Sequence, residues 1–170
     1  MITASCTQAV SLCLRAVTRP GDVVALESPT FFGYLDLIES LGLRVLEIPT
    51  HPATGLSLPA LELALDTQPV RVVLAAPTLS NPLGSVMPLA AKQKLVKLLA
   101  ARGVPLIEDV VFNDLLAGDE RRKAAKAFDT DGQVMVCGSF AKTLTPGIRL
   151  GWVAAGRWRD NVAVSYTHLR

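Results

Sequence analysis

The strongest constraint on the fold is a regular alternation of short apolar segments with helix-forming segments. Apolar runs typical of buried strands occupy residues 23–26, 70–76, 104–107 and 134–137. Gly42 and Gly103 each follow a helical segment, at the position where a left-handed backbone commonly ends a helix. Strands that alternate with helices predict an α/β domain with a mostly parallel sheet and helices on both faces.

The remaining elements follow from the same pattern. Helices are predicted over residues 7–17, 31–41, 59–65 and 88–101, and further strands over 43–48 and 150–155. Ser57 is placed to cap the helix 59–65. In a sheet of this kind, ligands bind at the carboxyl ends of the strands and in the loops that follow them.

Composition excludes several classes of function. The 170 residues are 50% hydrophobic and 19% charged, which fits one globular core. A net charge of +2 is too small to indicate a nucleic-acid or membrane partner. No apolar run reaches the length of a membrane span, no signal peptide opens the chain, and the three cysteines form no CxxC pair. We therefore expect a cytoplasmic protein with free thiols and no metal site.

The sequence pattern at both ends of the chain indicates truncation. A helix-forming segment begins almost at Met1, and the last ten residues show no clear periodicity. We expect residues 1–160 to form a large-domain fragment truncated at both ends, and residues 161–170 to be a disordered or non-native tail.

Lys142 is the most informative polar residue. It follows the apolar run 134–137, and a lysine at the mouth of a buried strand is poorly solvated, so its pKa should fall. Such an amine can attack a carbonyl and form a Schiff base. Ser139 and Arg149 add a hydroxyl and a cation suited to a phosphate, and together the three side chains indicate pyridoxal phosphate. A solvated surface lysine is the alternative.

Two segments near helix starts could contribute to the same site. Ser5, Cys6 and Thr7 lie where backbone N–H groups and hydroxyls favour an anion, although ordinary helix capping also explains them. Phe31 follows a strand and could stack on a flat ring, although core packing is the alternative.

Two more segments follow buried strands. Pro82 holds Asn81 out of the helical conformation, which leaves its amide available to a ligand oxygen; a simple Asn-Pro turn is the alternative. Asp109 follows Glu108 at the end of a strand, where a carboxylate could pair with a protonated ring nitrogen or could equally hold a magnesium ion.

Taken in chain order, these segments resemble the fold type I pyridoxal-phosphate enzymes, specifically the class I and II aminotransferases. Within that group they are most similar to the aminotransferase-like domain of MocR-type (GntR-family) transcription regulators. The similarity is carried by the motifs at 15–22, 27–31, 80–84 and 139–152 and extends over roughly residues 2–160.

This resemblance implies a role for each candidate residue. Lys142 would form the Schiff base and move a proton between the substrate Cα and the cofactor, and Asp109 would keep the pyridine nitrogen protonated. Asn81 would bond the ring oxygen O3′, and Phe31 would stack on the ring. The phosphate would be surrounded by Ser5, Cys6, Thr7, Ser139 and Arg149. Phe112 stands where relatives often carry a tyrosine that also bonds O3′.

Two functions share these residues. The first is transamination of an amino acid with a 2-oxo acid; the alternative is a non-catalytic domain that senses pyridoxal phosphate or an amine in a DNA-binding regulator. Other pyridoxal-phosphate reactions and a structural domain without a cofactor are further readings.

The resemblance also implies a homodimer, and DNA binding only through an N-terminal winged helix. Neither that domain nor the C-terminal domain that binds the substrate carboxylate is recognisable here. We therefore expect this chain to bind the cofactor with little turnover.

Overall fold

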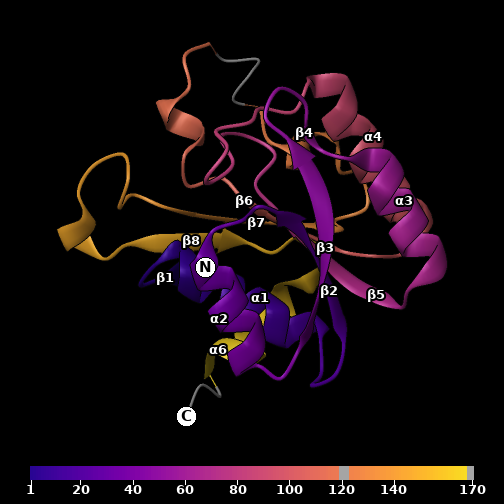
Figure 1. The fold of residues 1–170 in the computed structure, drawn as a ribbon. Coiled ribbons are helices and arrows are strands. Elements are labelled where there is room, and N and C mark those ends of the chain that lie inside the picture. Colours follow the sequence, from indigo (N-terminus) through magenta and orange to yellow (C-terminus); the bar gives the residue numbers. More distant parts are fainter. Residues whose placement is uncertain (119–122, 168–170) are drawn as a thin grey trace.

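The computed structural model describes residues 1–118 and 123–167 and is built on one eight-stranded sheet (Figure 1). The spatial order of the strands is β1-β8-β7-β6-β5-β2-β3-β4. The strands are β1 (Ile2–Thr3), β2 (Val23–Ser28), β3 (Arg44–His51), β4 (Gly55–Leu56), β5 (Val70–Ala75), β6 (Leu106–Asp109), β7 (Val134–Ser139) and β8 (Gly151–Ala154).

The centre of the sheet is parallel, as the alternation of strands and helices predicts. Strands β7, β6, β5, β2 and β3 pair in parallel, whereas β1, β8 and β4 join the two edges in antiparallel pairs. The chain leaves β2 for β3 on one side and later returns to β5 on the other. Such a reversal opens a crevice at the carboxyl ends of the strands, where ligands bind in sheets of this type.

Helices cover both faces of the sheet (Figure 1). One face carries α1 (Cys6–Val17), α2 (Phe32–Ser40) and α6 (Arg159–Thr167), and the other carries α3 (Leu58–Thr67) and α4 (Leu89–Ala101). Short 3-10 turns occur in the connections: η1 (Asn113–Leu115), η2 (Ala125–Phe128), η3 (Pro146–Ile148) and η4 (Gly156–Trp158).

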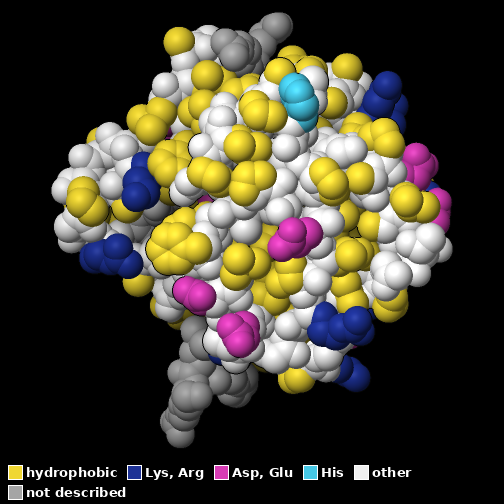
Figure 2. Space-filling model, in the orientation of Figure 1, with side chains coloured by type: hydrophobic (Ala, Val, Ile, Leu, Met, Phe, Trp, Pro, Cys, Tyr) yellow, Lys and Arg dark blue, Asp and Glu magenta, His cyan; other side chains and the backbone are white. Residues whose placement is uncertain are grey.

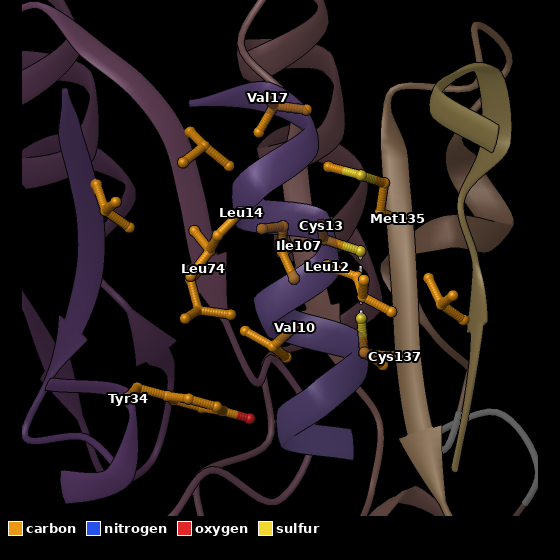
Figure 3. Close-up of a cluster of buried hydrophobic side chains, with 14 of the residues drawn as sticks. Val10, Leu12, Cys13, Leu14, Val17, Tyr34, Leu74, Ile107, Met135 and Cys137 are labelled. Carbon is orange, nitrogen blue, oxygen red and sulfur yellow. Dashed lines mark hydrogen bonds between the residues drawn. The ribbon is translucent and has the colours of Figure 1, made fainter. Parts of the chain in front are cut away.

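The strands divide their side chains between two cores. In β5, Val72 and Leu74 pack with α1, whereas Val73 and Ala75 pack with α3 and α4. This division follows from the two-residue period of a strand, which sends successive side chains to opposite faces. In the first core, Figure 3 shows Cys13 of α1 and Cys137 of β7 facing each other, with 3.7 Å between their buried sulfur atoms.

The local signals for helix ends are confirmed. Gly42 and Gly103 both have φ of 66°, in the left-handed region that favours glycine, and each lies just past the end of a helix. The Ser57 hydroxyl accepts a hydrogen bond from the backbone N–H of Ala60 and caps α3. Helix boundaries elsewhere agree with the sequence pattern to within two residues or so.

The structure differs from the sequence prediction in several places, and it adds the short edge strands β1 and β4, which the sequence pattern did not predict. Strand β6 begins at Leu106 and not at Val104, because the N–H of Val104 bonds back to Leu99 at the end of α4. Residues 161–167, expected as a tail, continue the helix α6, whose Val162 is fully buried in the core beside α1. Residues 168–170 of that expected tail lie outside the described residues.

The face of the molecule drawn in Figure 2 is mostly uncharged. Hydrophobic side chains spread across it, and charged side chains are few and scattered among them. In the described ranges 1–118 and 123–167, no helix has the length and apolar character needed to cross a membrane.

Candidate functional site

A cavity of about 360 Å³ lies at the carboxyl edge of the parallel strands, and we call it the edge cavity. All nine residues proposed from the sequence line it, although they come from five separate segments of the chain: Ser5, Cys6, Thr7, Phe31, Asn81, Asp109, Ser139, Lys142 and Arg149. Glu27, Thr30, Tyr34, Ala76, Val111, Phe112, Ala141 and Pro146 complete the lining. The fold therefore brings the predicted residues together at one place.

Asp109 ends strand β6 and is 8% exposed. Three donors contact its carboxyl group: the Tyr34 hydroxyl at Oδ2, the Cys6 thiol at Oδ1 (3.2 Å) and the backbone N–H of Val111 at Oδ1 (2.9 Å). Hydrogen bonds to both oxygens fix the orientation of the carboxyl group and favour its ionised form.

The protonation of Asp109 is set by two opposing effects. Burial raises its pKa above the usual value, and the hydrogen bonds from Tyr34, Val111 and Cys6 offset part of that rise. A cation placed beside the carboxyl group would lower the pKa again. The site is therefore suited to a protonated ring nitrogen.

Glu108 lies on the opposite face of the sheet from Asp109. Its two carboxylate oxygens accept hydrogen bonds from the backbone N–H groups of Ala125 (2.6 Å) and Lys126 (2.9 Å), at the start of η2. Adjacent strand residues point to opposite faces, so the two carboxylates do not converge on one ion. Glu108 and Asp109 therefore do not form a shared pair of ligands.

Lys142 lies in the turn between β7 and β8, and its side chain is exposed. Its Nζ is 6.0 Å from the centre of the Phe112 ring, on the edge cavity. The expectation of a poorly solvated lysine is wrong for this chain, because the turn extends beyond the strand end (Figure 1). Leu144 and Ile148 in the same connection are 70% and 52% exposed, so nothing within the described residues covers this segment.

The start of α1 forms another wall. Ser5 is the N-cap of the helix, and its hydroxyl accepts a hydrogen bond from the N–H of Gln8 at 3.0 Å. The capping interpretation is therefore confirmed, and Ser5 still lines the edge cavity. A Cβ atom added at Gly151 of β8 would lie 2.7 Å from the Ser5 carbonyl oxygen, so glycine allows this close approach.

Asn81 reaches the edge cavity from a tight turn after β5. The turn is closed by hydrogen bonds between Ser80 and Ser85: their hydroxyls are 2.6 Å apart, and the N–H of Ser80 donates to the carbonyl of Ser85 at 3.1 Å. Ser80 and Ser85 are buried and Asn81 is exposed. The turn therefore presents the Asn81 amide at the cavity.

Aromatic rings line two sides of the edge cavity. Phe31 is half-buried and packs edge-on against Tyr34, with 5.4 Å between ring centres. Phe112 stands on the side of Lys142. A flat ligand between such walls would gain stacking contacts.

Sequence reasoning missed two buried titratable residues of the edge cavity, Tyr34 and Glu27. Tyr34 follows Phe31 by three positions at the start of a helix, a spacing that places two side chains on one face. That spacing is a signal that could have identified it. In Figure 3 its hydroxyl points toward the N-terminal end of α1. Glu27 lies within a recognised motif, at the carboxyl end of the buried strand β2.

The fold and the edge cavity define an α/β domain that gathers a lysine, a buried aspartate, an amide and a helix N-terminus at one sheet edge. The family model "Aminotransferase class I and II" matches residues 1–165. The chain belongs to the class I and II aminotransferase family, as the sequence motifs predicted.

Relatives within the family include both regulators and enzymes. The uncharacterized HTH-type transcriptional regulator YjiR of Escherichia coli (strain K12) is 41% identical over 162 residues, covering 95% of this chain and 34% of YjiR. Tyrosine aminotransferase of Homo sapiens is 32% identical over 163 residues, covering 94% of this chain and 36% of the enzyme. The chain thus spans about a third of the length of these relatives.

The fold agrees with a solved member of the family. The structure of LysN, the alpha-aminoadipate aminotransferase of Thermus thermophilus complexed with N-(5'-phosphopyridoxyl)-L-leucine, matches with a TM-score of 0.87 and 28% identity. The match covers 98% of this chain and 44% of LysN. The predicted architecture, a mostly parallel sheet of the fold type I aminotransferases, is therefore confirmed.

Proposed function

We propose that the edge cavity binds pyridoxal 5'-phosphate and that the protein containing this domain transfers an amino group between an amino acid and a 2-oxo acid. The observation that carries the proposal is the meeting of Lys142, Asp109 and Asn81 at one cavity. A primary amine, a buried carboxyl group and an amide are the donor set that this cofactor needs, so the residues present fit it.

Each residue has a task that its place in the fold supports. Asp109 would hold the ring nitrogen, and its own orientation is set by Tyr34, Cys6 and Val111. Asn81 would bond the ring oxygen, and Phe31 would pack on the ring. The phosphate would lie among the N-terminus of α1 and four side chains that line the cavity beside it: Ser5, Thr7, Ser139 and Arg149.

Cys6 has a different proposed role from Ser5 and Thr7, which also lie at the start of α1. Its thiol donates to Asp109, so we place it with the residues that orient the carboxyl group. The bound cofactor supplies the electron-withdrawing ring that makes amino-group transfer possible. Lys142 would condense through its amine with the cofactor carbonyl, with loss of water. Once the substrate amine has displaced it, the free Lys142 amine would hold or release a proton beside the substrate carbon.

A second candidate function is sensing. The 41% identity to an HTH-type transcriptional regulator favours a regulatory role. In that role the domain would bind the same cofactor and respond to an amine without turnover. In that case DNA would be contacted by another part of the protein. Both functions imply the same cavity, and a homodimer is part of either proposal.

The test is covalent attachment of pyridoxal phosphate to Lys142. The purified chain is mixed with the cofactor, its visible spectrum is recorded, and the mixture is reduced with borohydride and mapped by mass spectrometry. Wild type is compared with Lys142→Ala and with Lys94→Ala, a matched change at an exposed lysine of α4. We expect the absorption band of the cofactor to shift and Lys142 to be labelled in wild type and Lys94→Ala, and neither change in Lys142→Ala.

Equal labelling of all three proteins would overturn the proposal. The two candidate functions are then separated in the whole protein by supplying an amino acid with a 2-oxo acid. Formation of the new amino acid supports the aminotransferase, and a spectral change without product supports the sensor.

A further inference from the structure

Glu27 is a second buried carboxyl group in the edge cavity. It lies at the carboxyl end of β2, is 4% exposed, and lines the cavity together with Asp109. Its Oε1 accepts a hydrogen bond from the backbone N–H of Ala76 at 3.0 Å. Within residues 1–118 and 123–167, no cation forms an ion pair with it. A buried carboxylate without a cation is costly, and protonation removes the cost.

The charges around Glu27 are few. The titratable groups that share the cavity are Asp109 of β6, Tyr34 of α2, Cys6 of α1, and the exposed Lys142 and Arg149 of the connection between β7 and β8. On the neighbouring strand β3, Glu47 accepts a hydrogen bond from Ser28 at 2.9 Å, on the exposed surface. Among these groups, Asp109 is the one whose like charge raises the pKa of Glu27.

These surroundings favour the protonated form of Glu27. Burial raises its pKa to about 7, the Ala76 N–H offsets part of the rise, and the Asp109 charge adds to it. A group in this range changes its charge across the pH interval in which a cell operates. Among the described residues, three donors contact Asp109 and one contacts Glu27, so Glu27 is the carboxyl group less able to hold a charge.

We propose that Glu27 sets the charge of the cofactor cavity: its protonated form accommodates the anionic cofactor, and its ionised form weakens binding. The inference rests on the proposed function. Pyridoxal phosphate brings a negatively charged phosphate into a cavity that already holds Asp109. A second ionised carboxylate in the same poorly solvated space repels that charge. Glu27 therefore acts through the field in the cavity and takes no part in bond making.

The chain offers a direct test. Glu27→Gln keeps an oxygen that can accept the hydrogen bond from the Ala76 N–H, and it removes the titratable carboxyl group. Glu47→Gln makes the same chemical change on the next strand, at an exposed position. Dissociation constants for pyridoxal phosphate are measured by fluorescence or absorbance from about pH 5.5 to about pH 8.5. The pH dependence of the dissociation constant in Glu27→Gln reports the titration of the cofactor itself. It therefore serves as the baseline for wild type.

We expect wild type to lose about tenfold more affinity than Glu27→Gln between about pH 6 and about pH 8. Glu47→Gln should follow wild type. Parallel curves for wild type and Glu27→Gln, with binding intact in both, would overturn the role of Glu27 and leave the proposed function standing. Absence of binding in every protein would overturn the proposed function.

The pKa of Glu27 can be measured directly in the absence of cofactor. The carboxyl carbon of Glu27, assigned in NMR spectra by its absence from Glu27→Gln, should titrate near pH 7 in the unliganded chain. Titration near 4.5, the ordinary value for glutamate, would contradict the inference whatever the cofactor does.

Discussion

The hydroxyl of Tyr34 donates a hydrogen bond to Oδ2 of Asp109, although the two residues are 75 positions apart in the chain. Tyr34 reaches the carboxyl group from the first turns of α2, whereas Asp109 ends β6. Both are buried, so water does not replace the bond readily. Phe112 lacks a hydroxyl, and Tyr34 is the phenol that the fold brings to the site from another element.

Loss of that hydroxyl should weaken cofactor binding. Tyr34→Phe removes one of two side-chain donors to Asp109 and leaves the ring packing in place, so we expect affinity for pyridoxal phosphate to fall about tenfold. The measurement is a spectroscopic titration. Tyr166→Phe, at a 44% exposed position of α6, is the control and should match wild type. Equal affinity in Tyr34→Phe would show that the bond does not support Asp109.

The hydrogen bond from the Cys6 thiol to Asp109 can be tested by substitution of Cys6. Cys6→Ser keeps a donor to Asp109 and should stay within about twofold of wild type in cofactor affinity, whereas Cys6→Ala should weaken binding about threefold to tenfold. The comparison uses the same titration. Equal losses in Ser and Ala variants would mean that thiol volume matters and hydrogen bonding does not.

Stability should depend on pH through Glu27. The pKa of Glu27 is about 7 in the folded protein against 4.5 as its ordinary value, so the folded state holds the proton more tightly. Its stabilising contribution is complete below about pH 4.5 and is lost as the pH rises to about 7. The free energy of unfolding should fall by about 3 kcal/mol over that interval from this group.

The measurement is urea unfolding at several pH values. Glu27→Gln should lack this decline, so the difference in unfolding free energy between wild type and variant should change steadily from about pH 4.5 to about pH 7. Glu47→Gln should decline as wild type does. A constant difference between wild type and Glu27→Gln would contradict the shifted pKa.

Lys92 is a fully buried lysine on the far side of the sheet. Its ammonium donates to Thr78 Oγ1 at 2.5 Å and to the carbonyl of Lys123 at 2.8 Å, near the buried Glu108. Lys92→Met should cost about 3 kcal/mol of unfolding free energy, because a charged partner of Glu108 is lost. Lys94→Met, exposed on the same helix, should change stability by less than about 0.5 kcal/mol. Similar urea midpoints for the two variants would contradict this account.

Substitution by alanine should affect stability differently at two glycines near the edge cavity. Gly151→Ala would place a Cβ 2.5 Å from the backbone carbon of Ser5 and should destabilise the chain by about 2 kcal/mol or more. Within the part of the chain that the structure describes, a Cβ added at Gly147 would meet only the Thr145 hydroxyl, at 3.9 Å, so Gly147→Ala should be tolerated. Thermal unfolding measures both, and an unchanged midpoint for Gly151→Ala would show that β8 can move away from α1.

The sequence by itself determined the fold class and the approximate place of the main strands and helices. Apolar periodicity and helix-ending glycines such as Gly42 are local properties, and a parallel sheet collects its strand ends at one edge. For that reason Asn81, Asp109 and Lys142 could be assigned to one site before any contact was known.

Only the tertiary structure decided which groups touch Asp109, how exposed Lys142 is, and that α6 packs beside α1. Contacts between Tyr34, Cys6 and Asp109 join residues far apart in the chain, so they depend on how helices lie across strands and not on local pattern. Exposure of Lys142 depends on how far its turn projects from the sheet. The short helix α6 has weak periodicity, and burial of Val162 against α1 fixes it where its own sequence signal is faint.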